Sequence, residues 1–162
     1  MRGKSIFLAA MLAIAAQLPA AGERSERLQE LTFGFAAGKG FVTGSGSEIA
    51  ALQWRLEFRS RCMYAASRLS WVAQECNSRP NPKELSLLAG ASLPMGNGRT
   101  RFNVGLGLGI VSAHSRKFAS LPCEARLKHG VIALTAFSNF NGAYSFHGLC
   151  VSLDFPVWSL KR

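Results

Sequence analysis

The chain has 162 residues, of which 48% are hydrophobic, and a formal net charge of +10. A chain of this length forms one domain. After the N-terminal segment, no stretch approaches the roughly 18 consecutive apolar residues of a membrane helix, which excludes a helical membrane protein.

Residues 1–22 have the pattern of a signal peptide. Arg2 and Lys4 precede an apolar run at 6–16, and three small residues then offer a cleavage site. The apolar run is too short to cross a bilayer as a helix, and no Cys follows it to carry a lipid. We therefore expect this segment to be removed, leaving one exported domain at 23–162.

The exported domain stays strongly basic, because loss of Arg2 and Lys4 lowers the net charge by two, to +8. A basic surface favours an acidic partner. For an exported bacterial protein the nearest dense anion is the phosphate-bearing head group of lipopolysaccharide, which Lys and Arg bind by charge and, for Arg, by bidentate hydrogen bonds. The alternative is that the charge serves solubility alone. We expect no nucleic-acid partner, because the exported chain lacks a basic-aromatic motif.

Alternating side chains predict strands in the first half of the chain. A strand at 31–37 is followed by a Gly-rich loop at 38–46, and the clearest strand is 49–59. In that strand an apolar set alternates with a polar set: Leu52, Trp54, Leu56 and Phe58 against Gln53, Arg55, Glu57 and Arg59. This period of two residues indicates a strand and does not fit the spacing of apolar residues in an amphipathic helix. We expect the polar set to face a lumen in which the charges pair.

Four further strands follow the same rhythm. They are predicted at 63–73, 84–93, 101–111 and 123–128, separated by a turn at 60–61, a Pro-containing loop at 74–83, a turn at 94–98 and a loop at 112–122. The strand at 101–111 carries Gly105, Gly107 and Gly109 on one face. These glycines lack the spacing and the following helix of a nucleotide loop, so we interpret them as allowing crowded packing inside a small barrel.

The last two strands are predicted as a hairpin at 130–157, closed by Asn141-Gly142. Asn-Gly favours a two-residue type I′ turn, which needs positive φ at both central positions. That turn predicts the register: Ser138 opposite Ser145, Ala136 opposite His147, and Leu134 opposite Leu149. Aliphatic residues then share one face, and small or polar residues share the other, a pattern typical of a barrel in lipid.

Eight strands with alternating short turns and longer loops predict an all-β fold, an eight-stranded antiparallel up-and-down transmembrane β-barrel in the bacterial outer membrane. An even strand number places both chain ends on the periplasmic side. A soluble lipocalin-like barrel would need an apolar interior, and inward Arg55, Glu57 and Arg68 argue against it. The sequence leaves open whether the protein forms a homodimer.

Four cysteines are compatible with disulfides in an oxidising compartment, and four allow three pairings. Cys76 and Cys123 are predicted in loops at the outer rim, with Cys62 at the opposite end, so any disulfide should join Cys76 to Cys123. Because no CxxC or Cys/His metal spacing occurs, we expect small apolar or single-bridge roles and no metal or cofactor.

The hairpin resembles that of the lipid A 3-O-deacylases of the PagL type, a family of acyloxyacyl hydrolase-like outer-membrane barrels. The resemblance rests on Phe137-Ser138-Asn139 followed by Asn141-Gly142, on the Gly-rich strand at 104–109, and on Phe155-Pro156 in the closing strand. The core motif of the family is His-x-Ser-Asn, with Ser as nucleophile, His as base and a nearby Glu that orients the His. Ser138 and Asn139 match, whereas the base position holds Ala136.

The resemblance implies an esterase that removes a 3-O-linked acyl chain from lipid A, with Ser138 forming an acyl-enzyme and Asn139 helping to shape the oxyanion site. The predicted register makes His147 the diagonal neighbour of Ser138, so His147 is the candidate base, supplied by the neighbouring strand. The alternative is a non-catalytic small outer-membrane barrel with a structural or lipopolysaccharide-binding role. In that reading Ser138 merely lies near the interface and His147 has no catalytic partner.

Overall fold

The computed structural model describes residues 29–43, 46–74, 81–96, 100–113 and 115–160. The predicted signal peptide lies outside these residues. The strands are β1 (Gln29–Val42), β2 (Glu48–Ser60), β3 (Met63–Gln74), β4 (Lys83–Met95), β5 (Thr100–Ala113), β6 (Arg116–His129), β7 (Ile132–Phe140) and β8 (Phe146–Leu160). Within the described part of the chain, no helix is long and apolar enough to cross a membrane.

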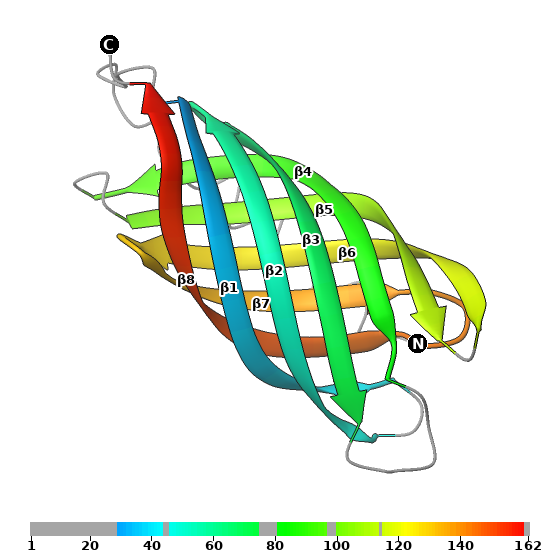
Figure 1. Ribbon diagram of the computed structural model, residues 1–162. Coiled ribbons are helices and arrows are strands. Elements are labelled where there is room, and N and C mark those ends of the chain that lie inside the picture. Colours follow the sequence, from blue (N-terminus) through cyan, green and yellow to red (C-terminus); the bar gives the residue numbers. More distant parts are fainter. Residues whose placement is uncertain (1–28, 44–45, 75–80, 97–99, 114, 161–162) are drawn as a thin grey trace, which may run out of the picture.

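Each strand pairs with the next in the chain, and β1 pairs antiparallel with β8, so the sheet closes into a barrel (Figure 1). The predicted eight-stranded antiparallel fold is therefore confirmed. We call the end at which β1 begins and β8 finishes the turn end; there β2 connects to β3, β4 to β5 and β6 to β7. The opposite end, where β1 connects to β2 and β7 to β8, is the loop end.

The alternation predicted for the strand at 49–59 is confirmed in β2. Its polar residues Gln53, Arg55, Glu57 and Arg59 are buried, whereas Leu52, Leu56 and Phe58 are each more than 40% exposed. The other strands follow the same rule, so the barrel is polar inside and apolar outside over much of its height. A strand shows this arrangement when it separates a filled lumen from an apolar surrounding, because successive side chains point to opposite faces.

Ion pairs fill the middle of the lumen. Glu124 of β6 accepts from Arg55 at 2.8 Å, from the Tyr64 hydroxyl at 2.8 Å and from Arg68 at 3.4 Å. Arg126 contacts Glu57 at 2.9 Å and Asp154 at 2.5 Å. The expectation that inward charges pair is thus confirmed, and the network ties together strands that are not neighbours in the sheet.

Nearer the loop end the lumen is apolar. A buried cluster includes Val42, Ile49, Val72, Val111, Phe137 and Phe146. The Phe137 and Phe146 rings pack edge to face, with centroids 6.2 Å apart. The interior therefore has two layers, a charged one and an apolar one.

The glycines of β5 do provide crowded packing. A Cβ added at Gly105 would overlap the Tyr64 hydroxyl, and one added at Gly109 would meet Ser120 Oγ at 2.7 Å. Gly105 thus makes room for the side chain that hydrogen-bonds Glu124.

Two predicted loops are largely strand. β1 runs through the glycines at 38 and 40, because these residues mark a close approach to β8: a Cβ at Gly38 would meet the Cα of Cys150 at 2.6 Å. β6 begins at Arg116 and contains Pro122, at which the pairing with β5 is interrupted. Cys123 consequently lies within a strand and not in a rim loop, which corrects the prediction. Cys62, Cys123 and Cys150 are free thiols, and Cys76 lies outside the described residues.

The register of the final hairpin differs from the prediction by two residues. Ser138 lies opposite His147, Ala136 opposite Leu149 and Leu134 opposite Val151. The predicted two-residue turn is wrong, because neither Asn141 nor Gly142 has positive φ and the connection spans 141–145. A shift of two leaves every side chain on its predicted face, since the side-chain period of a strand is two.

Removal of the Glu124 charge should destabilise the barrel. The Glu124→Gln variant leaves Arg55 and Arg68 without their shared carboxylate in a buried site, which we expect to cost about 3–5 kcal/mol of unfolding free energy. Urea unfolding of the folded protein measures this difference. The matched control is Glu48→Gln, an exposed carboxylate, expected to stay within about 0.5 kcal/mol of the parent. Equal stability of the two variants would contradict the role given to the network.

Candidate functional site

Ser138 of β7 and His147 of β8 form a directly opposed cross-strand pair on the outer face near the loop end. The predicted register made them diagonal neighbours, about 7 Å apart at Cβ, whereas directly opposed residues have Cβ atoms about 5 Å apart. The structure therefore brings the two candidate catalytic side chains closer together than the sequence suggested. We call them the Ser138–His147 pair.

His147 is held by residues of β1 and of the strand that carries Ser138. Its Nε2 atom lies 2.7 Å from the hydroxyl of Thr43, the residue that follows β1. The imidazole also packs between two aromatic rings, with its centroid 5.6 Å from that of Phe41 and 5.2 Å from that of Phe140. These contacts fix the orientation of the imidazole, which a general base requires.

Asn139, the candidate oxyanion residue, lies on the other face of β7. Its side chain is fully buried in the lumen, and its Oδ1 accepts a hydrogen bond from Asn141 Nδ2 at 2.9 Å. Strand alternation thus separates the Asn139 amide from the Ser138 hydroxyl. The amide contacts the 141–145 connection instead.

Asn141 organises that connection through its side chain. Its Oδ1 accepts from the backbone N–H groups of Ala143 at 3.0 Å and Tyr144 at 2.6 Å, and its Nδ2 donates to the Tyr144 carbonyl at 2.8 Å. Ser145 Oγ donates to the Asn141 carbonyl at 2.9 Å. An Asn side chain that mimics a backbone turn explains why the hairpin is wider than the Asn-Gly signal predicts.

The outer face around Ser138 carries groups from five strands. Register pairs align Cys123 of β6, Ser138, His147, Phe41 of β1 and Glu48 of β2 in one row across the sheet. Ala136, at the position of the family's base, faces Leu149 in the next row. The carboxylates of Glu124 and Asp154 are buried in the lumen, on the opposite face of the sheet from His147. The hydroxyl of Thr43 is a polar partner of the imidazole.

Thr43 and Phe41 were missed by the sequence analysis. Thr43 and His147 are separated by 104 residues, and both Phe41 and Thr43 fall in the stretch interpreted as a Gly-rich loop. Only the closure of β1 against β8 brings them to the site. No local motif in the sequence could have signalled this contact.

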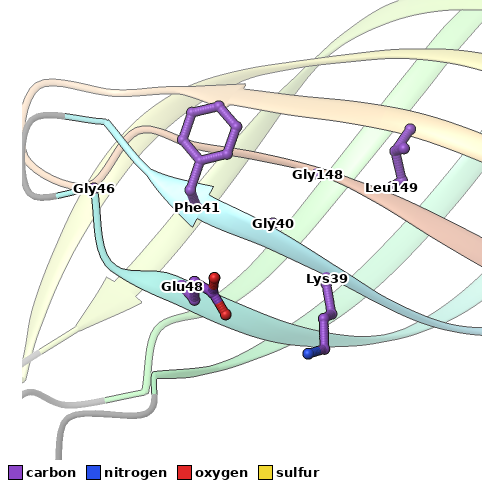
Figure 2. A pocket seen from close by; sticks show the side chains of 7 residues that line it. All are labelled: Lys39, Gly40, Phe41, Gly46, Glu48, Gly148 and Leu149. Atoms are coloured by element: carbon purple, nitrogen blue, oxygen red, sulfur yellow. The ribbon is translucent and has the colours of Figure 1, made fainter.

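A hollow of about 530 Å³ adjoins the Ser138–His147 pair on the far side of Phe41. Its lining includes Lys39, Gly40, Phe41, Glu48, Gly148 and Leu149. Figure 2 shows Lys39 and Glu48 on one side of β1 and Phe41 and Leu149 on the other. The hollow thus has a charged side and an apolar side. Among the residues that the structure describes, no group of three or more His, Cys, Asp or Glu side chains is arranged to hold a metal ion.

No protein-family model and no curated protein matches the chain. Among solved structures it is similar to Ail, the attachment invasion locus protein of Yersinia pestis, crystallised with the heparin analogue sucrose octasulfate. The likeness covers 81% of this chain and 100% of that chain, at 15% sequence identity and a TM-score of 0.46. A likeness this distant carries no argument about function.

The Asn141 side chain should be needed to keep the 141–145 connection closed. Asn141→Ala removes its four side-chain hydrogen bonds, and we expect faster chymotrypsin cleavage after Tyr144 in the folded protein, by about fivefold or more, since each bond contributes about 1 kcal/mol. The control is Gly142→Ala, because a Cβ there meets no atom within 4 Å. Unchanged cleavage of Asn141→Ala would show that the hydrogen bonds are dispensable.

Proposed function

We propose that the protein is an integral β-barrel of the bacterial outer membrane. The observation that carries the proposal is the exposure of large apolar side chains all around the barrel, such as Leu108 at 75% and Leu87 at 66%, over a lumen filled with ion pairs. A soluble protein rarely exposes a continuous apolar surface of this kind. A closed barrel also satisfies its backbone hydrogen bonds internally, as lipid requires.

The arrangement of chain ends supports the outer membrane in particular. Both β1 and β8 have their outer ends at the turn end, which in small outer-membrane barrels is the periplasmic side. The signal peptide predicted at 1–22 would deliver the chain for export. The loop end, with the Ser138–His147 pair, then faces the leaflet that contains lipopolysaccharide.

The filled lumen argues against a channel. The charged layer around Glu124 and the apolar layer around Phe137 and Phe146 occupy the interior at successive depths. An eight-stranded barrel has an interior only wide enough for side chains. We infer that the function lies on the outer surface and at the rim.

The membrane proposal predicts that the protein fractionates with the outer membrane and migrates faster in detergent gels before heating than after. The folded barrel resists detergent and stays compact, whereas heating unfolds it. Vesicles containing the folded protein should show no ion conductance above that of protein-free vesicles. Recovery of the protein as a soluble periplasmic monomer would overturn the proposal.

The direct pairing of Ser138 with His147 favours a second, more specific function, an esterase of the lipid A 3-O-deacylase type. A serine hydroxyl is a weak nucleophile without an adjacent base, and His147 is the imidazole on the neighbouring strand at the same level. Thr43 orients the imidazole, a role that Glu fills in the family. Asn139 would support the site by holding the 141–145 connection through Asn141.

The proposed reaction uses the pair as nucleophile and base. Ser138 Oγ forms a bond to the acyl carbonyl carbon of lipid A while its proton passes to His147. The bond from that carbon to the 3-oxygen of the sugar breaks, and the sugar hydroxyl leaves with the proton. Water, deprotonated by His147, then releases the fatty acid and restores Ser138.

Deacylation of lipid A by the protein in vesicles tests this function. We expect both Ser138→Ala and His147→Ala to lower the rate at least about 100-fold, because each removes one half of the unit. The control is Ser67→Ala, another outward-facing serine, on β3 and away from His147. If the parent is inactive and only Ala136→His gains activity, His147 is not the base, and the protein is a non-catalytic barrel with a structural or lipopolysaccharide-binding role.

A further inference from the structure

The hollow beside Phe41 contains two opposite charges that do not pair with each other. Lys39 and Glu48 are both exposed, and neither forms an ion pair with any residue in the described part of the chain. They are diagonal neighbours, since Lys39 lies opposite Ala50 and Glu48 lies opposite Phe41. The hollow therefore offers an unpaired ammonium, on Lys39, and an unpaired carboxylate, on Glu48, to a bound molecule.

Lys39 is an unusual residue for its place in the barrel. It points outward from β1, and its direct neighbours on the two flanking strands are Ala50 and Leu149. A cation that faces lipid destabilises a barrel unless it reaches the interface or meets an anion. Both direct neighbours are apolar, and the diagonal Glu48 does not pair with Lys39, so the ammonium of Lys39 is available to an anion from outside the chain.

The floor of the hollow is built from paired glycines. Gly40 lies opposite Gly148, and a Cβ at Gly40 would meet the Cα of Gly148 at 2.8 Å. β1 and β8 therefore approach closely at this level. Side chains on either side, Phe41 and Leu149 above all, then stand as walls around a depression.

We propose that this hollow binds a phosphoethanolamine head group, with the phosphate at Lys39, the ammonium at Glu48, and an acyl chain along Leu149. A phosphate and a primary ammonium separated by two carbons match a cation and an anion that flank one depression. The inference rests on the membrane location proposed above. It does not depend on the esterase, because no residue of the Ser138–His147 pair lines the hollow.

The two charged residues are expected to select for different parts of the lipid head group. Lys39 recognises any lipid phosphate, whereas Glu48 recognises an ammonium that donates hydrogen bonds. Phosphatidylethanolamine engages both, phosphatidylglycerol only Lys39, and phosphatidylcholine lacks the N–H donors for Glu48. The head group could be carried by a glycerophospholipid or by a lipid A that bears phosphoethanolamine, so lipid A with and without this group is compared as well.

Native mass spectrometry of the folded protein released from detergent micelles measures retention of each lipid at equal concentration. We expect the parent to retain phosphatidylethanolamine about three to ten times more than phosphatidylcholine. Lys39→Gln should lose retention of phosphatidylethanolamine and phosphatidylglycerol alike. Glu48→Gln should retain phosphatidylglycerol and lose the preference for phosphatidylethanolamine. The control is Lys83→Gln, an exposed lysine on β4 that contacts Trp71 and lies outside the hollow.

The inference is overturned if the parent retains the three phospholipids equally, or if Lys39→Gln behaves as Lys83→Gln does. The comparison within the parent needs no variant, so it decides the question even if Lys39→Gln fails to fold. Heat-modifiable migration, measured on the same samples, separates the two proposals. Loss of selectivity in a folded, membrane-inserted barrel refutes this site alone, whereas failure of the parent to insert refutes the membrane location and this site together.

Discussion

The charge balance inside the lumen is the constraint on which the barrel depends. Five buried or half-buried cations meet five carboxylates there: Arg55, Arg59, Arg68, Arg126 and Lys128 with Glu30, Glu57, Glu84, Glu124 and Asp154. An uncompensated charge at such a depth would be costly, and the shared carboxylates avoid it by serving two cations each. The excess positive charge of the chain therefore does not reside in this network, and Lys39 on the outer face is one place where it does.

The fold was predictable because alternation is a local property. Leu56 and Glu57 reveal opposite faces of β2 without any knowledge of their partners, and eight such segments suffice to define a barrel. Because of the same periodicity, the error in the predicted register of the last hairpin did not change the predicted face of any side chain. The Asn141 side chain widens the connection, and the shift of two residues moves every pair while leaving Ser138 and His147 on the outer face.

The candidate site was less accessible to sequence reasoning. Ser138 and His147 were found because they lie in one hairpin, where a turn constrains register. Thr43 and Phe41 reach His147 only through the closure of β1 on β8, and the glycines at 38 and 40 made that part of β1 look like a loop. A glycine that signals a turn and a glycine that permits close strand approach have the same sequence signature.

The same closure explains why the residues of the hollow and of the Ser138–His147 pair gather at one place. Lys39 and Phe41 lie near the end of β1, Thr43 follows that strand, and His147 lies near the start of β8. The line where the barrel closes therefore carries both the hollow and the Ser138–His147 pair near the loop end. Phe41 lies between them: its ring packs against His147 and its side chain lines the hollow. A head group in the hollow would therefore be separated from the Ser138 hydroxyl by the tilted rings of Phe41 and His147. The proposed lipid binding and the proposed ester chemistry could then be gained or lost independently on one surface, since Lys39 and Glu48 lie on other strands than the candidate nucleophile Ser138.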